Sequence, residues 1–113
     1  MMLIFSSVEK FDKEVNEKVL EKPCTYVIRK GDEILYVGST INCRNRLKKH
    51  FIYMNSNGSI LIKHIKKLGL NPMQVLLGST IWIEYCNNIK ECREREEKFI
   101  KILKPKFNIR KKK

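Results

Sequence analysis

The segment at residues 25–38, TYVIRKGDEILYVG, constrains the fold of this chain more than any other part. It contains two short runs rich in β-branched and aromatic residues, and Gly31-Asp32 between them favours a tight turn. A β-hairpin is therefore expected here. Because successive side chains of a strand point to opposite faces, the second run should place Ile34, Tyr36 and Gly38 on one face and Leu35 and Val37 on the other.

The first 22 residues are expected to form an amphipathic helix. Ser6 or Ser7 can cap it, and Pro23 ends it. Its apolar side chains recur at steps of 3, 4 and 4 residues: Val8, Phe11, Val15 and Val19.

The remaining pattern predicts three further helices and a third strand. The first helix follows a cap at Ser39, Thr40 or Asn42 and runs to about Met54. Ser59 caps a second helix that runs to Leu68, and residues 80–86 read as a strand. The last helix is capped by Asn87 or Asn88 and runs through residue 103, while residues 73–77 favour neither state.

This order of elements predicts an α+β sandwich with a small three-stranded antiparallel sheet flanked by helices, plus the extra N-terminal helix. The expected organisation is that helix at residues 1–22, one domain at 23–108 and a basic tail at 109–113. There is no internal repeat, and no second domain is indicated.

The charge of the chain is unusual. With 24 basic and 12 acidic residues, its formal net charge is +12. Such a surplus favours a polyanionic partner, most commonly nucleic acid, over plain solubilising charge. The lysines expected to contact DNA are Lys48, Lys49, Lys63, Lys66, Lys67, Lys104 and Lys106.

The composition argues against a membrane or secreted protein. No apolar run approaches the ~18 residues that a membrane span needs, and the N-terminus makes a poor signal peptide. The four cysteines form no C-x-x-C pair, so a zinc site has weak support and buried free thiols are the expectation. An intracellular location is expected, in the cytoplasm of the source cell or of a host.

A basic stretch directly after the hairpin carries chemistry. Arg46 and His50 stand four residues apart, so a helix places them on one face. That helix follows the strand that carries Tyr36. One short segment can thus bring a phosphate-binding guanidinium together with a phenol and an imidazole, which can move protons or orient water.

The last helix contains a carboxylate on its apolar stripe. Glu96 interrupts the run Cys92, Phe99, Ile100 and Leu103, where an unpaired charge costs several kcal/mol. Two explanations are about equally favoured: a structural ion pair with Arg46, or a site for Mg²⁺ or Mn²⁺, which prefer oxygen ligands.

Taken in order, these pieces resemble a known family. The hairpin reads T-Y-V at Thr25 and Y-V-G at Tyr36, the arginine and histidine follow, and K-P-K-F-N comes at residues 104–108, after the inward glutamate. Residues 24–108 are thus similar to a GIY-YIG nuclease domain. The first half of the motif departs from the family pattern, because Cys24-Thr25 replaces G-I, which implies altered packing and retained chemistry.

The resemblance implies an α/β sandwich that cuts DNA phosphodiesters with one divalent metal, Mg²⁺ or Mn²⁺. By position, Glu96 resembles the metal-binding glutamate and Arg46 the arginine that holds the scissile phosphate. Tyr36 resembles the tyrosine that helps to activate water. The remaining matches are Tyr26, which lines the site, His50, found in some branches, and Asn108, which supports the site.

Three functions follow from these features. The leading one is a metal-dependent DNA endonuclease with weak sequence specificity or a preference for DNA structure. The first alternative is a non-catalytic nucleic-acid-binding module, and the second is a small zinc or redox protein that uses its cysteines. A homodimer and a partner protein that supplies specificity both stay open.

Overall fold

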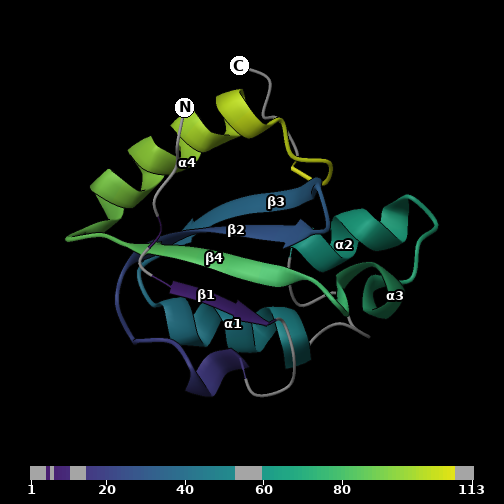
Figure 1. Cartoon of the computed structure of the whole chain (residues 1–113), viewed down its shortest axis with the longest axis horizontal. Helices are drawn as coiled ribbons and strands as arrows, with labels where there is room; N and C mark the ends of the chain where they lie inside the picture. Colours follow the sequence, from purple (N-terminus) through teal and green to yellow (C-terminus); the bar gives the residue numbers. More distant parts are fainter. Residues whose placement is uncertain (1–4, 6, 11–14, 53–59, 109–113) are drawn as a thin grey trace.

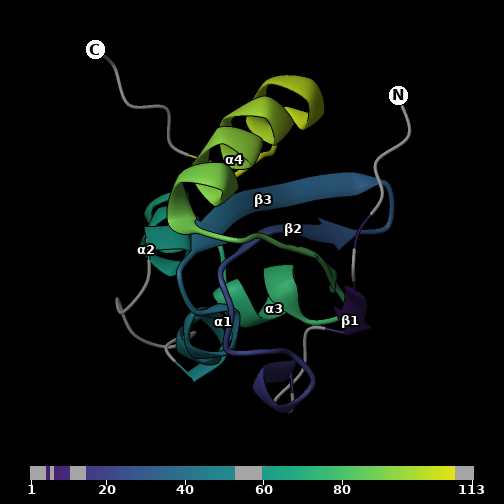
Figure 2. The same cartoon turned by 90° about the vertical axis from the view of Figure 1, so that its left-hand side faces the viewer.

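The computed structural model describes residues 5, 7–10, 15–52 and 60–108. Within them, a four-stranded antiparallel sheet has the order β1-β4-β2-β3. Helix α4 covers one face of the sheet and α1, α2 and α3 the other (Figures 1 and 2). The bounds are β1 Ser7–Lys10, η1 Val15–Glu17, β2 Cys24–Lys30, β3 Glu33–Thr40, α1 Cys43–Ile52, α2 Ile60–Lys67, α3 Pro72–Leu76, β4 Thr80–Tyr85 and α4 Ile89–Leu103.

The α+β class and the antiparallel sheet flanked by helices confirm the prediction, but the N-terminal helix is wrong. Residues 7–10 form strand β1 and pair with β4, so the sheet has four strands instead of three. Val15 and Val19 are buried as expected, whereas Val8 is 48% exposed and Phe11 lies outside the described residues. Strand β1 satisfies backbone groups that would otherwise leave β4 as an open sheet edge. The division of the chain at residues 22 and 108 stays a prediction.

The hairpin forms as predicted, with Gly31 at φ +61° in its turn, but a β-bulge changes the expected faces. Ile28 pairs with Tyr36 and Arg29 with Ile34, which leaves Leu35 without a partner in β2. Leu35 therefore joins Tyr36 in the core beneath the sheet, while Ile34 and Val37 pack toward α4. The prediction that Leu35 shares a face with Val37 is wrong because it assumed unbroken alternation.

The helix ends follow local capping chemistry. Asn42 Oδ1 accepts the Asn45 backbone N–H at 3.0 Å at the start of α1, so Asn42 is the cap, while Ser39 and Thr40 end β3. Asn88 caps α4 by accepting from the N–H of Glu91 at 2.9 Å. Helix α3 overlaps residues 73–77, for which the sequence favoured neither state, and Asn71 caps it. The predicted cap Ser59 and helix end Met54 lie outside the described residues.

The segment after α4 runs along the outer side of β3, and we call residues 105–108 the strap. The N–H groups of Lys106 and Phe107 donate to the carbonyls of Ile34 and Leu35 at 3.0 and 2.8 Å. Phe107 is buried in the main core. The strap therefore covers the edge of the sheet at the bulge, where the pairing with β2 is irregular.

Strand β3 carries a close backbone approach at Gly38. Tyr26 on β2 pairs with Gly38 and is fully buried. A Cβ at Gly38 would lie 2.5 Å from the Tyr26 hydroxyl oxygen, well inside contact distance. The glycine therefore leaves space for the phenol to lie across β3. No helix among the described residues is long and apolar enough to cross a bilayer.

A Gly38→Ala substitution should test this contact. Alanine in place of glycine would normally stabilise a strand by restricting the unfolded chain, so the sign is informative. We expect Gly38→Ala to lower the free energy of unfolding by about 1–3 kcal/mol, because the methyl group displaces Tyr26. Urea denaturation measures the change. An unchanged or higher midpoint would show that Tyr26 does not occupy this space.

Candidate active site

Two tyrosines lie side by side on β2 and β3. The ring centroids of Tyr26 and Tyr36 are 6.1 Å apart. Burial, reinforced by the neighbouring Tyr36, raises the pKa of Tyr26 well above its ordinary value, while the charge of Arg46 and a hydrogen bond with it act in the opposite direction. Burial also raises the pKa of Tyr36, Glu96 adds to the rise, and Arg46 lowers it. Both phenols are therefore held in the protonated form, and Arg46 is the group that favours their ionisation.

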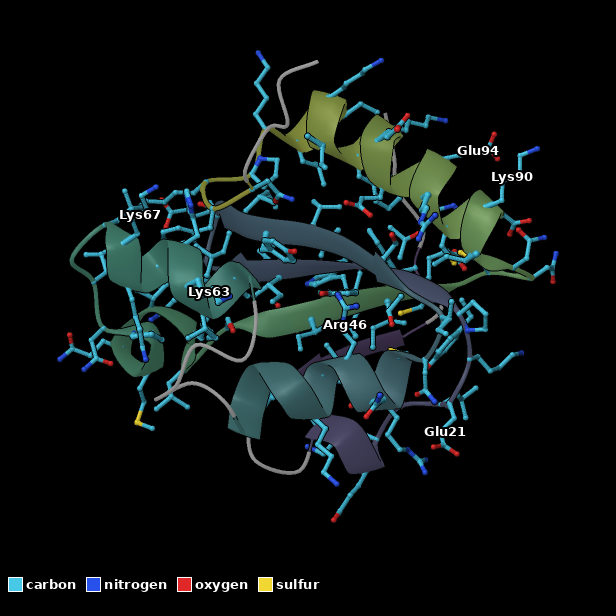
Figure 3. The ribbon with its side chains drawn as sticks, turned by 180° about the vertical axis from the view of Figure 1, so that it is seen from behind. Glu21, Arg46, Lys63, Lys67, Lys90 and Glu94 are labelled. Atoms are coloured by element: carbon cyan, nitrogen blue, oxygen red, sulfur yellow. The ribbon has the colours of Figure 1, made fainter. Side chains whose placement is uncertain are left out.

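Arg46 reaches this pair from the opposite layer. It projects from α1 toward the sheet and is half-buried (Figure 3). Among the described residues it forms no ion pair with Glu96, which removes the first explanation offered for the inward glutamate. Its guanidinium instead faces the two phenols, where a planar cation can bind an anionic oxygen.

Glu96 reaches the same edge of the sheet from α4. Its side chain is half-buried, and the Ser39 hydroxyl at the end of β3 donates a hydrogen bond to Oε1. This bond orients the carboxylate. Ser39 was not predicted as a site residue, because its place after Gly38 favoured a helix cap.

The donor set around Glu96 suits a hard divalent cation only in part. The described residues contain no cluster of three or more histidine, cysteine, aspartate or glutamate side chains that could hold a metal. A carboxylate oxygen is nevertheless a ligand that Mg²⁺ accepts, and this ion commonly keeps waters and binds substrate phosphates. The residues present therefore fit a metal site that is completed by the substrate.

Asn108 connects the strap to β3. Its Nδ2 donates to the Val37 carbonyl at 2.7 Å, and its Oδ1 accepts the Val37 N–H at 2.8 Å. The side-chain amide thus replaces a neighbouring strand beside the residue that follows Tyr36. Asn108 acts here on the position of β3.

Of the six predicted catalytic residues, the structure brings Tyr26, Tyr36, Arg46 and Glu96 to one edge of the sheet and places Asn108 beside them. His50 belongs to α1, but its side chain lies outside the described part, as does that of Lys49. Thr25, in the altered first half of the motif, is buried and donates to the Cys92 carbonyl at 2.8 Å. This hydrogen bond links β2 to α4, and it is a contact that the isoleucine of the family pattern could not make.

The predicted DNA-binding lysines differ in their surroundings. Lys48, Lys63, Lys67 and Lys104 are exposed, and Lys66 is half-buried. Lys63 on α2 faces the same side of the molecule as Arg46, with Lys67 farther along that helix (Figure 3). Lys106 instead lies 3.7 Å from Glu33 and over the ring of Phe107. These contacts occupy it in part.

His64 and the cysteines belong to the interior. His64 is half-buried, and its Nδ1 is buried with no hydrogen-bond partner among the described residues. Its ring meets Phe107 edge-on at 6.3 Å. All four cysteines are buried and free, which confirms that expectation. Burial raises the pKa of Cys92 to about 12, so this thiol is protonated and gives no support to a zinc thiolate site.

Known proteins are similar to this chain in sequence and in fold. Residues 22–110 match the family model described as the GIY-YIG catalytic domain. The UvrABC system protein C of Thermosipho africanus is 30% identical over 98 residues, 87% of this chain and 15% of that protein. That of Borreliella burgdorferi is 31% identical over 99 residues, 83% and 14% respectively. The chain therefore spans about one seventh of the length of these curated relatives.

Solved structures agree with the fold. The GIY-YIG N-terminal endonuclease domain of UvrC from Thermotoga maritima, bound to magnesium, superimposes with a TM-score of 0.61 at 20% identity, covering 87% of this chain and all of that one. A variant of that domain with an asparagine changed to alanine, bound to its catalytic divalent cation, gives 0.62 at 19% identity over 88% of this chain and all of that one. At these identities the likeness shows the fold alone.

Removing the Asn108 amide should loosen β3. We expect Asn108→Ala to lower the free energy of unfolding by about 1–3 kcal/mol, because the Val37 N–H and carbonyl lose their partner. Asn87→Ala, at an exposed position before α4, is the matched control and should change stability by much less. Thermal or urea unfolding measures both. Equal effects of the two substitutions would contradict the role assigned to the strap.

Proposed function

The chain belongs to the GIY-YIG catalytic domain family, and from that premise we propose that it is a divalent-metal-dependent DNA endonuclease. It hydrolyses phosphodiester bonds with weak sequence specificity or with a preference for DNA structure. The observation that carries the proposal is the convergence of Arg46, Tyr36 and Glu96, from three different elements, on one edge of the sheet. In the proposed reaction, the two charged groups and the phenol act on the same phosphate.

Each side chain has a separate task in this reaction. Glu96 would hold Mg²⁺ or Mn²⁺ through a carboxylate that Ser39 orients. When bound, such an ion lowers the pKa of a water molecule and stabilises a leaving oxygen. Arg46 binds the scissile phosphate and neutralises charge that builds up on it.

Tyr36 is the proton acceptor for the attacking water, and Tyr26 lines the site beside it. Free tyrosine titrates near pH 10, and burial moves the pKa of Tyr36 higher still. Arg46 is the neighbour that opposes this rise, so it also makes Tyr36 a usable base. His50, four residues after Arg46, would assist from the same helix, and Asn108 would keep Tyr36 in place by holding Val37.

The DNA path follows the basic side of the molecule. The exposed ammonium groups of Lys63 and Lys67 extend along α2 on the side that Arg46 faces. Backbone contacts of this kind carry little sequence information, which supports weak specificity. The remaining proposed contacts are Lys48, Lys49, Lys66, Lys104 and Lys106.

Cleavage of supercoiled plasmid with added Mg²⁺ or Mn²⁺ tests the proposal. The natural chain should nick and linearise the plasmid, and Glu96→Gln, which removes the charge at constant size, should reduce cleavage to the level seen with excess EDTA. Glu94→Gln is the matched control, because Glu94 is exposed on α4 and lies away from Arg46 (Figure 3). Its activity should equal that of the natural chain.

Two results would contradict the nuclease. Equal cleavage by the Glu96→Gln variant and the natural chain would place the metal elsewhere. Binding of plasmid, branched and single-stranded DNA without any cleavage would favour the non-catalytic binding module.

The pH dependence should identify the proton acceptor. Because the pKa of Tyr36 is raised, its active, deprotonated form grows in population with pH across the whole neutral range. Single-turnover cleavage should therefore rise about tenfold per pH unit without levelling off below pH 9. Tyr36→Phe should remove this dependence, while Tyr85→Phe, whose hydroxyl accepts the Leu20 N–H at 3.0 Å, should retain it. A plateau near neutrality in the natural chain would point to a histidine instead.

A further inference from the structure

A cavity of about 330 Å³ lies between the last turns of α4 and the strap. Its lining combines apolar and basic side chains with one amide: Ile100, Lys101, Lys104, Pro105 and Asn108. Of these residues, Asn108 bonds Val37 and Lys104 is a proposed DNA contact. Its size is at the lower end of the range of small-ligand sites.

The charge of the cavity is uncompensated. Lys101 and Lys104 are both exposed, and neither forms an ion pair with another described residue. Lys106, one residue beyond Pro105, is by contrast engaged with Glu33. Two ammonium groups beside the apolar surfaces of Ile100 and Pro105 match the DNA backbone, whose phosphate is anionic and whose deoxyribose presents C–H groups.

Lys104 holds its position against a backbone cost. It ends α4 with φ 49° and ψ 61°, and it is the sole non-glycine residue with positive φ in the described part of the chain. Glycine is the usual residue at such a helix end, because a Cβ in the left-handed region costs roughly 1–2 kcal/mol. A lysine at this helix end keeps an ammonium group beside the cavity at a cost to the backbone.

The cavity adjoins the proposed active site on two sides. Ile100 stands one helical turn after Glu96 on α4, and Asn108 is bonded to Val37, the residue after Tyr36. From Glu96 to Lys104 the helix rises ~12 Å. This separation is large enough for a different phosphate of one strand to lie at each place.

We propose that this cavity is a second phosphate subsite, which binds another backbone phosphate of the cleaved DNA strand near the scissile bond. The inference rests on the proposed nuclease function and adds to it a fixed position of the strand. Lys101 and Lys104 neutralise the phosphate, and Ile100 and Pro105 contact its sugar. The subsite would hold the strand in register across Arg46, Tyr36 and Glu96.

The test measures binding of the full chain to a labelled duplex in EDTA, so that no cleavage occurs, over a range of NaCl concentrations. The double variant Lys101→Gln/Lys104→Gly removes both ammonium groups, and glycine at position 104 relieves the left-handed backbone, so loss of folding is not expected. Lys90→Gln/Lys98→Gln removes the same charge from exposed positions of α4 that do not line the cavity.

The cavity variant should bind more weakly and lower the slope of log K against log salt by about 0.9, the value for one phosphate. The Lys90/Lys98 variant should keep the slope of the natural chain.

An unchanged slope in the cavity variant would overturn the subsite even if cleavage is intact. If the chain binds as predicted but plasmid cleavage fails, the subsite stands and the proposed nuclease falls.

Discussion

The structure depends on the way strand β3 is held from both sides. On its inner side β3 pairs with β2, and on its outer side the strap supplies backbone and amide hydrogen bonds to Ile34, Leu35 and Val37. An outermost strand is normally the least constrained element of a sheet. Here the strap bonds the carbonyls of Ile34 and Leu35 and both backbone groups of Val37, so the strand that carries Tyr36 is fixed although it is the outermost strand of the sheet among the described residues.

The same constraint explains the electrostatics of the site. Because β3 is fixed, Tyr36 stays between Arg46 from one layer and Glu96 from the other, and its pKa reflects both charges in addition to burial. Because Tyr36, Arg46 and Glu96 are half-buried, water screens the effects of the two charges on this pKa less than it would at an exposed site. One carboxylate with one hydroxyl donor makes a weak metal site on its own, so a divalent ion and a DNA phosphate would assemble there together. In that case, metal affinity and DNA affinity should be coupled.

The sequence was most informative where a local signal had one physical reading. The Gly31-Asp32 turn, the Asn88 cap and the inward position of Glu96 were all recognisable from spacing and residue type. The bulge at Leu35 was not, because residues 34–37 are all apolar and give no alternation to break. Strand β1 was missed because valines at helical spacing are compatible with a helix, and only the open edge of β4 decides otherwise. Ser39 was assigned to a helix cap, since its bond to Glu96 joins residues 57 positions apart.

In the proposed site, a divalent ion binds at one edge of the sheet, between Tyr36 and Glu96. Paramagnetic broadening by Mn²⁺ in ¹H–¹⁵N spectra of the natural chain tests it without any assay of cleavage. Broadening should be strongest at the amides of Tyr36 to Ser39 and around Glu96. It should appear at lower Mn²⁺ concentration when a short DNA duplex is added, and it should vanish in Glu96→Gln. Broadening centred elsewhere, or unchanged in that variant, would contradict the account.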